Sequence, residues 1–208
     1  MSATGTRPTI GRYVLDDLVA ESAGSRMWRA TDPVLHRAVG VRLLDAEDPR
    51  ADALREAACL AAQVTDTRVV RILDVLDADD AVAVITEWVP GRPFAEVVAE
   101  GMTPLEAARV AREAAECLES AHAAGLGHGR LRPNSVLVSD QGDVRLRGLG
   151  VEAVLWGCDP DDDPLEADLH GVGALLYAGV TGRWPYGEAD GLPAVARASG
   201  AVPWPSRV

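Results

Sequence analysis

The residues with the most chemical potential lie in one stretch, His128–Gly150, which reads HGRLRPNSVLVSDQGDVRLRGLG. It opens with a histidine and carries Arg130, Arg132, Ser135 and Gly148 at intervals along its length. A guanidinium group donates hydrogen bonds and has no lone pair with which to accept a proton. Arg130 can therefore neither act as a general base nor hold a metal ion.

The same stretch predicts the element that would position these side chains. Residues 135–138 and 144–146 are rich in Val and Leu, and turn-forming residues separate the two runs. This pattern is typical of a β-hairpin. We expect its turn to direct Asp140 and Asp143 toward solvent.

The order of residues in this stretch resembles the catalytic loop and magnesium-binding segment of protein kinases. The family pattern is His-Arg-Asp-Leu-Lys-Pro-x-Asn, followed by a hairpin and Asp-Phe-Gly. Arg130 stands at the position of the catalytic Asp, and Arg132 at that of the Lys. Ser135 replaces the metal-binding Asn, and Gly148 replaces the Asp of Asp-Phe-Gly. The residues that shape the loop are kept, namely His128, Leu131, Pro133, Val136, Leu137 and Gly150.

These replacements determine what the resemblance implies for activity. Phosphoryl transfer in the family needs oxygens that hold magnesium and a carboxylate that accepts the proton of the substrate hydroxyl. We therefore predict a pseudokinase that is not an enzyme, with no catalytic residue, no metal ligand and no cofactor.

The N-terminal part resembles the small lobe of the kinase fold, whose first two strands flank a glycine-rich loop over the ATP phosphates. Ala20, Ser22 and Ser25 stand where the family has glycines, and Gly24 alone remains. Glycine is needed there because backbone amides must approach phosphate closely. An ordinary hairpin loop is the prediction here.

Five further positions would form a vestigial nucleotide cleft in this lobe. Arg42 replaces the ATP-contacting lysine, and Glu56 matches the helix glutamate that pairs with it. We expect an ion pair between the two, with Leu54, Ala58, Ala61 and Ala62 on one face of the same helix. Glu87, Trp88 and Val89 occupy the hinge, where Trp88 is interpreted as a packing residue.

The large lobe begins near Pro90. A long helix is predicted from Pro104, capped by Thr103, with His122 placed in its last turn to interact with the helix dipole. Residues 168–186 match the central helix of the family's large lobe, whose Asp, here Asp168, supports the catalytic loop. The segment between, Val151–Asp163, is short for an activation segment and contains no Ser, Thr or Tyr.

The composition of the chain argues against several classes of binding partner. The chain has 208 residues and a net charge of −12, which argues against nucleic acid and anionic membranes. No residue is a lysine, so lysine-dependent phosphate chemistry is excluded. Cys59, Cys117 and Cys158 are interpreted as small buried side chains in a reducing compartment.

The predicted fold class is α+β, a bilobal kinase-like fold with a small β-rich lobe and an α-helical large lobe that is cut short. We expect a flexible leader at 1–10, the small lobe at 11–88 and an incomplete large lobe at 89–208. The chain is then either the front of a longer protein or an unusually small version of the lobe.

Within the family, the chain resembles most the actinobacterial pseudokinases associated with the lipid II flippase. The strings Arg37–Leu44 and the short activation segment carry this likeness. It implies a cytoplasmic docking module in cell-wall synthesis, tethered to the membrane by a region outside this chain. Its partner would be a forkhead-associated protein that reads a phosphate on Ser2, Thr4, Thr6 or Thr9, or beyond the C-terminus. The alternatives are a weak nucleotide-binding switch and an atypical active serine/threonine kinase.

Overall fold

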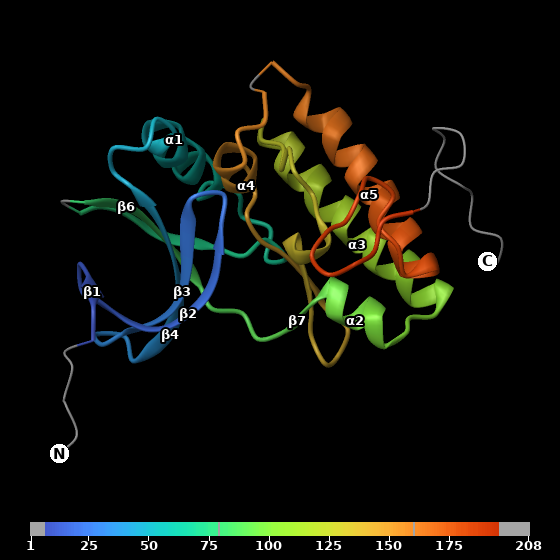
Figure 1. Ribbon diagram of the computed structural model, residues 1–208, viewed down its shortest axis with the longest axis horizontal. Helices are drawn as coiled ribbons and strands as arrows, with labels where there is room; N and C mark the ends of the chain where they lie inside the picture. Colours follow the sequence, from blue (N-terminus) through green and yellow to red (C-terminus); the bar gives the residue numbers. More distant parts are fainter. Residues whose placement is uncertain (1–6, 79, 160, 196–208) are drawn as a thin grey trace. The chain divides into compact units, whose positions relative to one another are not determined.

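The structure of the protein is a computed structural model that describes residues 7–78, 80–159 and 161–195. The chain, drawn as a ribbon in Figure 1, divides into two compact units. Each unit has its own hydrophobic core. The first comprises Met1–Gln63, Val70–Val89 and Val154–Gly157. The second comprises Val64–Val69, Pro90–Ala153 and Cys158–Val208. Among the described helices, none has the length and apolar character needed to cross a membrane.

A six-stranded antiparallel sheet makes up most of the first unit. In sheet order its strands are β1 (Thr9–Ile10), β2 (Tyr13–Ser22), β3 (Ser25–Asp32), β4 (Arg37–Asp45), β6 (Ala81–Glu87) and β5 (Ile72–Asp77). Ala23 and Gly24 alone connect β2 to β3, with φ of +50° and +72°. This backbone matches the twist of the flanking strands. The predicted ordinary hairpin loop is confirmed.

The first unit is stabilised by apolar residues of its central strands. Val39 and Val41 on β4 and Ala83 and Ile85 on β6 are fully buried. One helix, α1 (Ala51–Ala61), joins β4 to β5 and buries Leu54 among other residues. Successive strand residues point to opposite faces. β6 is buried continuously from Ala81 to Ile85, so side chains on both of its faces are buried.

The second unit combines helices with a three-stranded sheet. The helices are α2 (Phe94–Glu100), α3 (Pro104–Ala123) and α5 (Pro164–Thr181); a short α4 (Val151–Leu155), whose last two residues are assigned to the first unit, precedes α5. The strands are β7 (Arg92–Pro93), β8 (Val136–Val138) and β9 (Val144–Leu146), in that order in the sheet. β8 and β9 form the predicted hairpin, and Asp140 and Asp143 in its turn are exposed as expected.

The N-terminus of α3 carries the predicted cap. Thr103 Oγ1 accepts a hydrogen bond from Glu106 N at 3.3 Å, and the Glu106 carboxylate accepts one from Thr103 N at 2.8 Å. This reciprocal arrangement satisfies two backbone amides that the helix itself leaves unpaired. The bonds from Thr103 also lower the pKa of Glu106.

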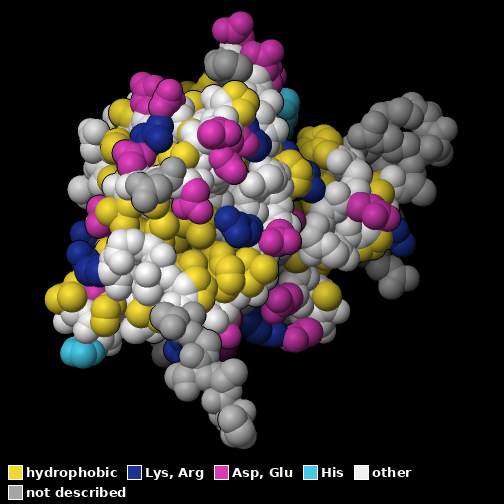
Figure 2. Space-filling view, turned by 60° about the vertical axis from the view of Figure 1, so that its left-hand side comes forward, with side chains coloured by type: hydrophobic (Ala, Val, Ile, Leu, Met, Phe, Trp, Pro, Cys, Tyr) yellow, Lys and Arg dark blue, Asp and Glu magenta, His cyan; other side chains and the backbone are white. Residues whose placement is uncertain are grey.

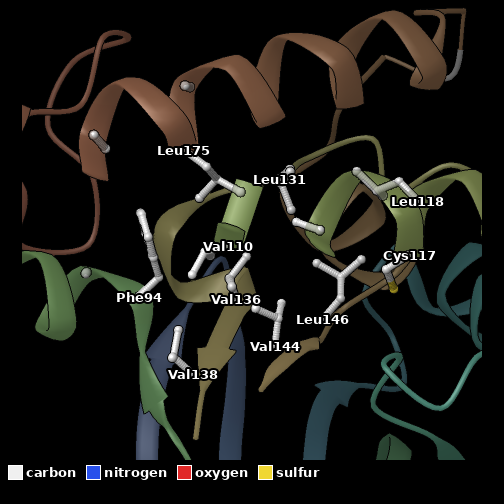
Figure 3. Packing of buried hydrophobic residues seen from close by; sticks show 14 of the residues in the cluster. Phe94, Val110, Cys117, Leu118, Leu131, Val136, Val138, Val144, Leu146 and Leu175 are labelled. Carbon is white, nitrogen blue, oxygen red and sulfur yellow. The ribbon is translucent and has the colours of Figure 1, made fainter. Parts of the chain in front are cut away.

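The core of the second unit lies between α3, the β8–β9 hairpin and α5 (Figure 3). Phe94, Val110, Val136 and Leu175 point into it from four different elements. The neighbouring loop approaches α5 so closely that a Cβ on Gly171 would lie 2.6 Å from Leu131 Cβ. The core therefore fixes the position of the loop that begins at His128.

The surface shows the acidic character of the chain. Asp and Glu side chains are spread over the face seen in Figure 2, with arginines between them. The prediction that all three cysteines are buried is wrong for Cys59, which is exposed on α1, and Cys158 is half-buried. Cys117 is buried in α3, and desolvation raises the pKa of its thiol to about 12.

Candidate functional site

The site is organised around Asp168, which is fully buried near the start of α5. Its Oδ2 accepts a hydrogen bond from His128 N and its Oδ1 accepts one from Gly129 N, both at 2.8 Å. Two backbone amides thus compensate the burial of the carboxylate. The predicted support of the loop by Asp168 is confirmed.

His122 completes the set of partners. Its Nε2 lies 2.8 Å from Asp168 Oδ2 and donates a hydrogen bond to it. The residue does lie in the last turn of α3, as predicted, but it contacts Asp168 and does not act through the helix dipole alone. A buried Asp requires several donors. This need of Asp168 for further hydrogen-bond donors is the signal that would have identified His122.

His128 connects the loop to the end of β9. It is fully buried, its Nε2 donates to Arg147 O at 3.0 Å, and its Nδ1 accepts from Arg130 N at 3.3 Å. Desolvation lowers the pKa of the imidazole, so the ring is neutral at physiological pH. Because both ring nitrogens are engaged within the protein, His128 positions the loop and does not transfer protons.

The replaced loop positions have structural roles. Ser135 Oγ is buried and accepts a hydrogen bond from Arg132 N at 3.1 Å, which closes a short 3₁₀ turn. Arg132 Nη2 donates to Glu188 O at 3.2 Å, and its guanidinium carbon lies 5.9 Å from the centre of the Trp184 ring. Arg130 is half-buried, and desolvation together with the charge of Arg132 lowers its pKa.

Glu152 supplies a carboxylate that the sequence analysis missed. Its backbone N donates to Gly148 O at 2.9 Å, so one helical turn returns its side chain to Gly148. A Cβ on Gly148 would lie 2.4 Å from Glu152 Cγ and 3.4 Å from Glu152 Oε1. The negative charge of Glu152 also opposes the lowering of the His128 and Arg130 pKa values. Its spacing of four residues from Gly148 was the available signal.

The two positions at which the kinase family holds magnesium do not fit that ion in this chain. The Ser135 hydroxyl already accepts from a backbone amide, and Gly148 has no side chain. Throughout the described ranges, no group of three or more His, Cys, Asp or Glu side chains is placed to hold a metal ion.

Arg42 and Glu56, both in the first unit, are not paired with each other in the described residues. Arg42 Nη1 donates to Ser25 Oγ at 3.3 Å, whereas Glu56 is exposed. The predicted ion pair is therefore wrong. At 100° per residue, Glu56 lies about 200° around α1 from Leu54, opposite the buried face. The periodicity that predicted the buried face was the reason to doubt the pair.

The three hinge residues also belong to the first unit. Glu87 Oε1 accepts from Arg71 N at 2.9 Å and its own N donates to Arg71 O at 2.9 Å, which extends the end of β6. Trp88 is half-buried, and the Arg29 guanidinium carbon lies 5.9 Å from the centre of its ring. This contact is consistent with the packing role predicted for Trp88, and Val89 beside it is half-buried.

A separate pocket of about 350 Å³ lies in the second unit between α2, the start of α3 and the β8–β9 turn. Its arginines are engaged by neighbouring groups. Arg92 pairs with Glu100 at 2.6 Å, while Arg109 Nη1 donates to Glu113 at 3.1 Å and to Gly142 O at 2.5 Å. The guanidinium groups of this pocket thus bond to residues of the protein itself, and the loop around Asp168 is the better candidate site.

Comparison with known proteins identifies the fold. The kinase domain of Mycobacterium tuberculosis PknI (C20A mutant) superposes with a TM-score of 0.69 over 85% of this chain and 76% of that one, at 16% identity. Rad53 1-466 in complex with AMP-PNP gives a TM-score of 0.72 over 85% of this chain and 50% of that one, also at 16% identity. The chain has a protein kinase-like fold. The predicted α+β fold class is confirmed.

Sequence comparison places this kinase-like domain among homologues of bacterial serine/threonine kinases. Serine/threonine-protein kinase PksC of Streptomyces coelicolor is 30% identical across 90% of this chain. Probable serine/threonine-protein kinase PknB of Corynebacterium glutamicum is 28% identical across 84%. The domain covers 40% and 32% of the length of these two relatives. No family model matches the chain.

These relatives correct one prediction. The chain was expected not to be an enzyme, but its homologues are named as serine/threonine-protein kinases over most of its length. The carboxylates outside the motif positions that the sequence suggests, Asp140 and Asp143, are exposed in the β8–β9 turn. Glu152 shows that a carboxylate can reach Gly148 from another position.

Proposed function

We propose that this kinase-like domain is a regulatory docking module for another protein. The observation that carries the proposal is the set of three hydrogen bonds, each 2.8 Å long, that Asp168 accepts from the loop and from His122. Groups that stabilise the loop are present, while Arg130, Ser135 and Gly148 stand where the family has reactive groups. A role based on a folded surface depends on the first set alone. It neither requires nor excludes phosphotransfer.

The proposed process is peptidoglycan synthesis, and the proposed partner is a forkhead-associated domain. Both follow from the resemblance to kinase-like domains associated with the lipid II flippase. Such a partner reads a phosphate with arginines, so the docking module must first receive one. Thr9 is an exposed candidate on β1, whereas Ser2, Thr4 and Thr6 lie outside the described residues.

Phosphorylation by a second kinase tests this function. The chain is incubated with an active bacterial serine/threonine kinase and ATP, and phosphates are mapped by mass spectrometry. We expect near-stoichiometric phosphate on a Ser or Thr, and loss of that signal when the mapped residue is changed to Ala. Absence of phosphate under conditions that modify a standard substrate of that kinase would contradict the docking proposal.

Glu152 favours a second candidate function, phosphotransfer by the domain itself. Its carboxylate lies beside Gly148, where the family has an Asp, and its charge acts on Arg130. In this candidate Glu152 supplies the carboxylate that the motif positions lack. The names of the relatives support the same activity.

A transfer assay with a matched pair of variants tests the second candidate. If the candidate is correct, Glu152→Gln lowers the rate of phosphotransfer by ~10²-fold or more. Glu166→Gln, an exposed residue in the first turn of α5, serves as the control and leaves the rate unchanged. Equal rates for the two variants, or no transfer by the wild type above a protein-free blank, would refute it.

A further inference from the structure

Residues 183–195, the red loop after α5 in Figure 1, form a closed segment of the second unit. Trp184 N donates a hydrogen bond to Pro193 O at 2.9 Å, so the two ends of this segment lie together. Trp184, Ala189 and Leu192 are buried in the core of the unit. The backbone of the 183–195 segment is therefore anchored at both ends and in the middle.

Two hydrogen bonds join the 183–195 segment to the loop that begins at His128. Arg132 Nη2 donates to Glu188 O at 3.2 Å, and Asn134 N donates to Asp190 Oδ2 at 3.0 Å. Guanidinium groups and backbone amides are the donors with which proteins commonly bind carboxylates and phosphates. The carboxylate of Asp190 is thus an anion that the chain itself supplies to this loop.

The loop carries two positive charges beside this carboxylate. Arg130 and Arg132 are both half-buried. Desolvation lowers the pKa of Arg130 most, the charge of Arg132 lowers it further, and the negative charge of Asp190 is among those that oppose this. Among the described residues, Asp190 forms no ion pair, and Nε and Nη1 of Arg132 have no hydrogen-bond partner. Donors therefore remain in this loop for an anion with several oxygens.

A phosphate group matches these donors better than a carboxylate does. Within the described ranges, the Asp190 carboxylate accepts one hydrogen bond, from Asn134 N. A phosphorylated Ser or Thr carries a charge of about −1.5 to −2 at pH 7 and three acceptor oxygens. It can accept from Asn134 N and from Arg132 at the same time, and arginine binds phosphate in a bidentate manner. The net charge of −12 favours a partner with a single phosphate over a polyanion.

We propose that Arg132 and the amide of Asn134 form a binding site for a phosphorylated Ser or Thr of a partner protein. Arg130 adds positive charge to this site, and Asp190 occupies it in the free chain. The phosphate displaces only the side chain of Asp190, because the buried residues of the 183–195 segment keep its backbone in place. This inference is independent of the phosphate that the chain itself is proposed to receive.

Fluorescence anisotropy of a labelled phosphoserine peptide with neutral flanking residues tests the site, with the full chain at roughly 1 μM to 1 mM. Asp190→Gly removes the internal carboxylate, and glycine adopts the φ of +53° at this position without strain. We expect this variant to bind the phosphopeptide at least about tenfold more tightly than the wild type. The same peptide with unmodified serine should bind neither chain.

A matched pair of arginine variants, each combined with Asp190→Gly, identifies the donor. Arg132→Gln should raise the dissociation constant of the phosphopeptide by at least about tenfold. Arg112→Gln, at an exposed arginine that pairs with Glu116 on α3, removes the same charge and should leave the constant unchanged. Thermal denaturation checks that each variant is folded, and the comparison of Asp190→Gly with the wild type does not depend on Arg132→Gln. A phosphopeptide that binds neither chain or both equally, or that both arginine variants weaken equally, would overturn the proposal.

Discussion

Asp168 illustrates how single residues decide the geometry of the candidate site. It is buried, it accepts hydrogen bonds from His128 N, Gly129 N and His122 Nε2, and its charge is compensated by these donors. The loop that carries Arg130 is thus fixed to α5 by these hydrogen bonds. The position of this loop depends on one carboxylate more than on any residue of the loop itself.

Replacement of Asp168 should therefore destabilise the second unit strongly. Asp168→Ala leaves two buried backbone amides and one imidazole without their acceptor, which should cost roughly 3 kcal/mol or more. Urea denaturation at pH 7 measures the free energy of unfolding. Asp162→Ala, at an exposed position, is the control and should change it by less than about 0.5 kcal/mol. A similar small effect at Asp168 would show that the loop is held by other contacts.

A second prediction at the scale of single residues concerns the effect on stability of a side chain at Gly148. Its φ is +82°, and a side chain there would contact Glu152 Cγ. Gly148→Ala should destabilise the protein by about 1–3 kcal/mol, through backbone strain and this contact together. Glu152→Ala in the same chain should recover part of the loss, because it removes the contact and leaves the strain. A double-mutant cycle by thermal denaturation measures the coupling, and strict additivity of the two changes would contradict the geometry.

At the scale of elements, the hairpin and the helix cap were predicted correctly from the sequence, whereas the direction of the Glu56 side chain was not. The hairpin of β8 and β9 followed from two apolar runs and a turn, and the cap of α3 from Thr103 before Pro104. Glu56 was assigned to the wrong side of α1 because the family pattern was preferred over the helical period. Periodicity states which face is buried, and this physical information was already present in the sequence.

Contacts between distant elements explain what sequence reasoning could not reach. His122 meets Asp168 because α3 and α5 pack side by side, and 46 residues separate the two along the chain. Glu152 reaches Gly148 because the chain makes a helical turn at α4. The contact of His122 with Asp168 has no local sequence signature, whereas the spacing of four residues is the local signal for Glu152. Both become evident once the helices are placed.

The segment Val64–Val69 is stabilised by the carboxylate of Asp66, and this leads to a prediction at the scale of elements. Asp66 accepts hydrogen bonds from Arg68 Nη2 at 2.8 Å and from Ser120 Oγ at 2.9 Å, which connects the segment to α3. The bonds from Arg68 are the largest cause that lowers the pKa of Asp66. Because the folded pKa is depressed, this stabilisation is complete above the ordinary value of about 3.9 and is lost as pH falls below it.

Asp66→Asn should accordingly be less stable than the wild type at pH 7, by roughly 1–3 kcal/mol. The difference should shrink at about pH 3, where the unfolded wild-type chain takes up a proton and the variant does not. Chemical denaturation at the two pH values measures this. A difference in stability that is the same at both would show that the carboxylate of Asp66 is not the stabilising group.

At the scale of the whole molecule, the resemblance to the kinase family was enough to predict the fold. The composition argued against nucleic acid and anionic membranes as partners. The spacing of His128, Asp168 and the hairpin was enough to predict a kinase-like fold, which solved kinases confirm. The same spacing did not decide activity, because a replaced motif residue does not exclude a carboxylate from elsewhere. Glu152 is the example in this chain.

The docking role is tested most directly by the affinity of a forkhead-associated domain for the chain before and after phosphorylation. Isothermal titration calorimetry with the phosphorylated chain, the unmodified chain and a chain whose mapped Ser or Thr is replaced by Ala gives the three dissociation constants. The proposed function predicts at least about tenfold tighter binding of the phosphorylated chain alone. Equal dissociation constants for all three would contradict it.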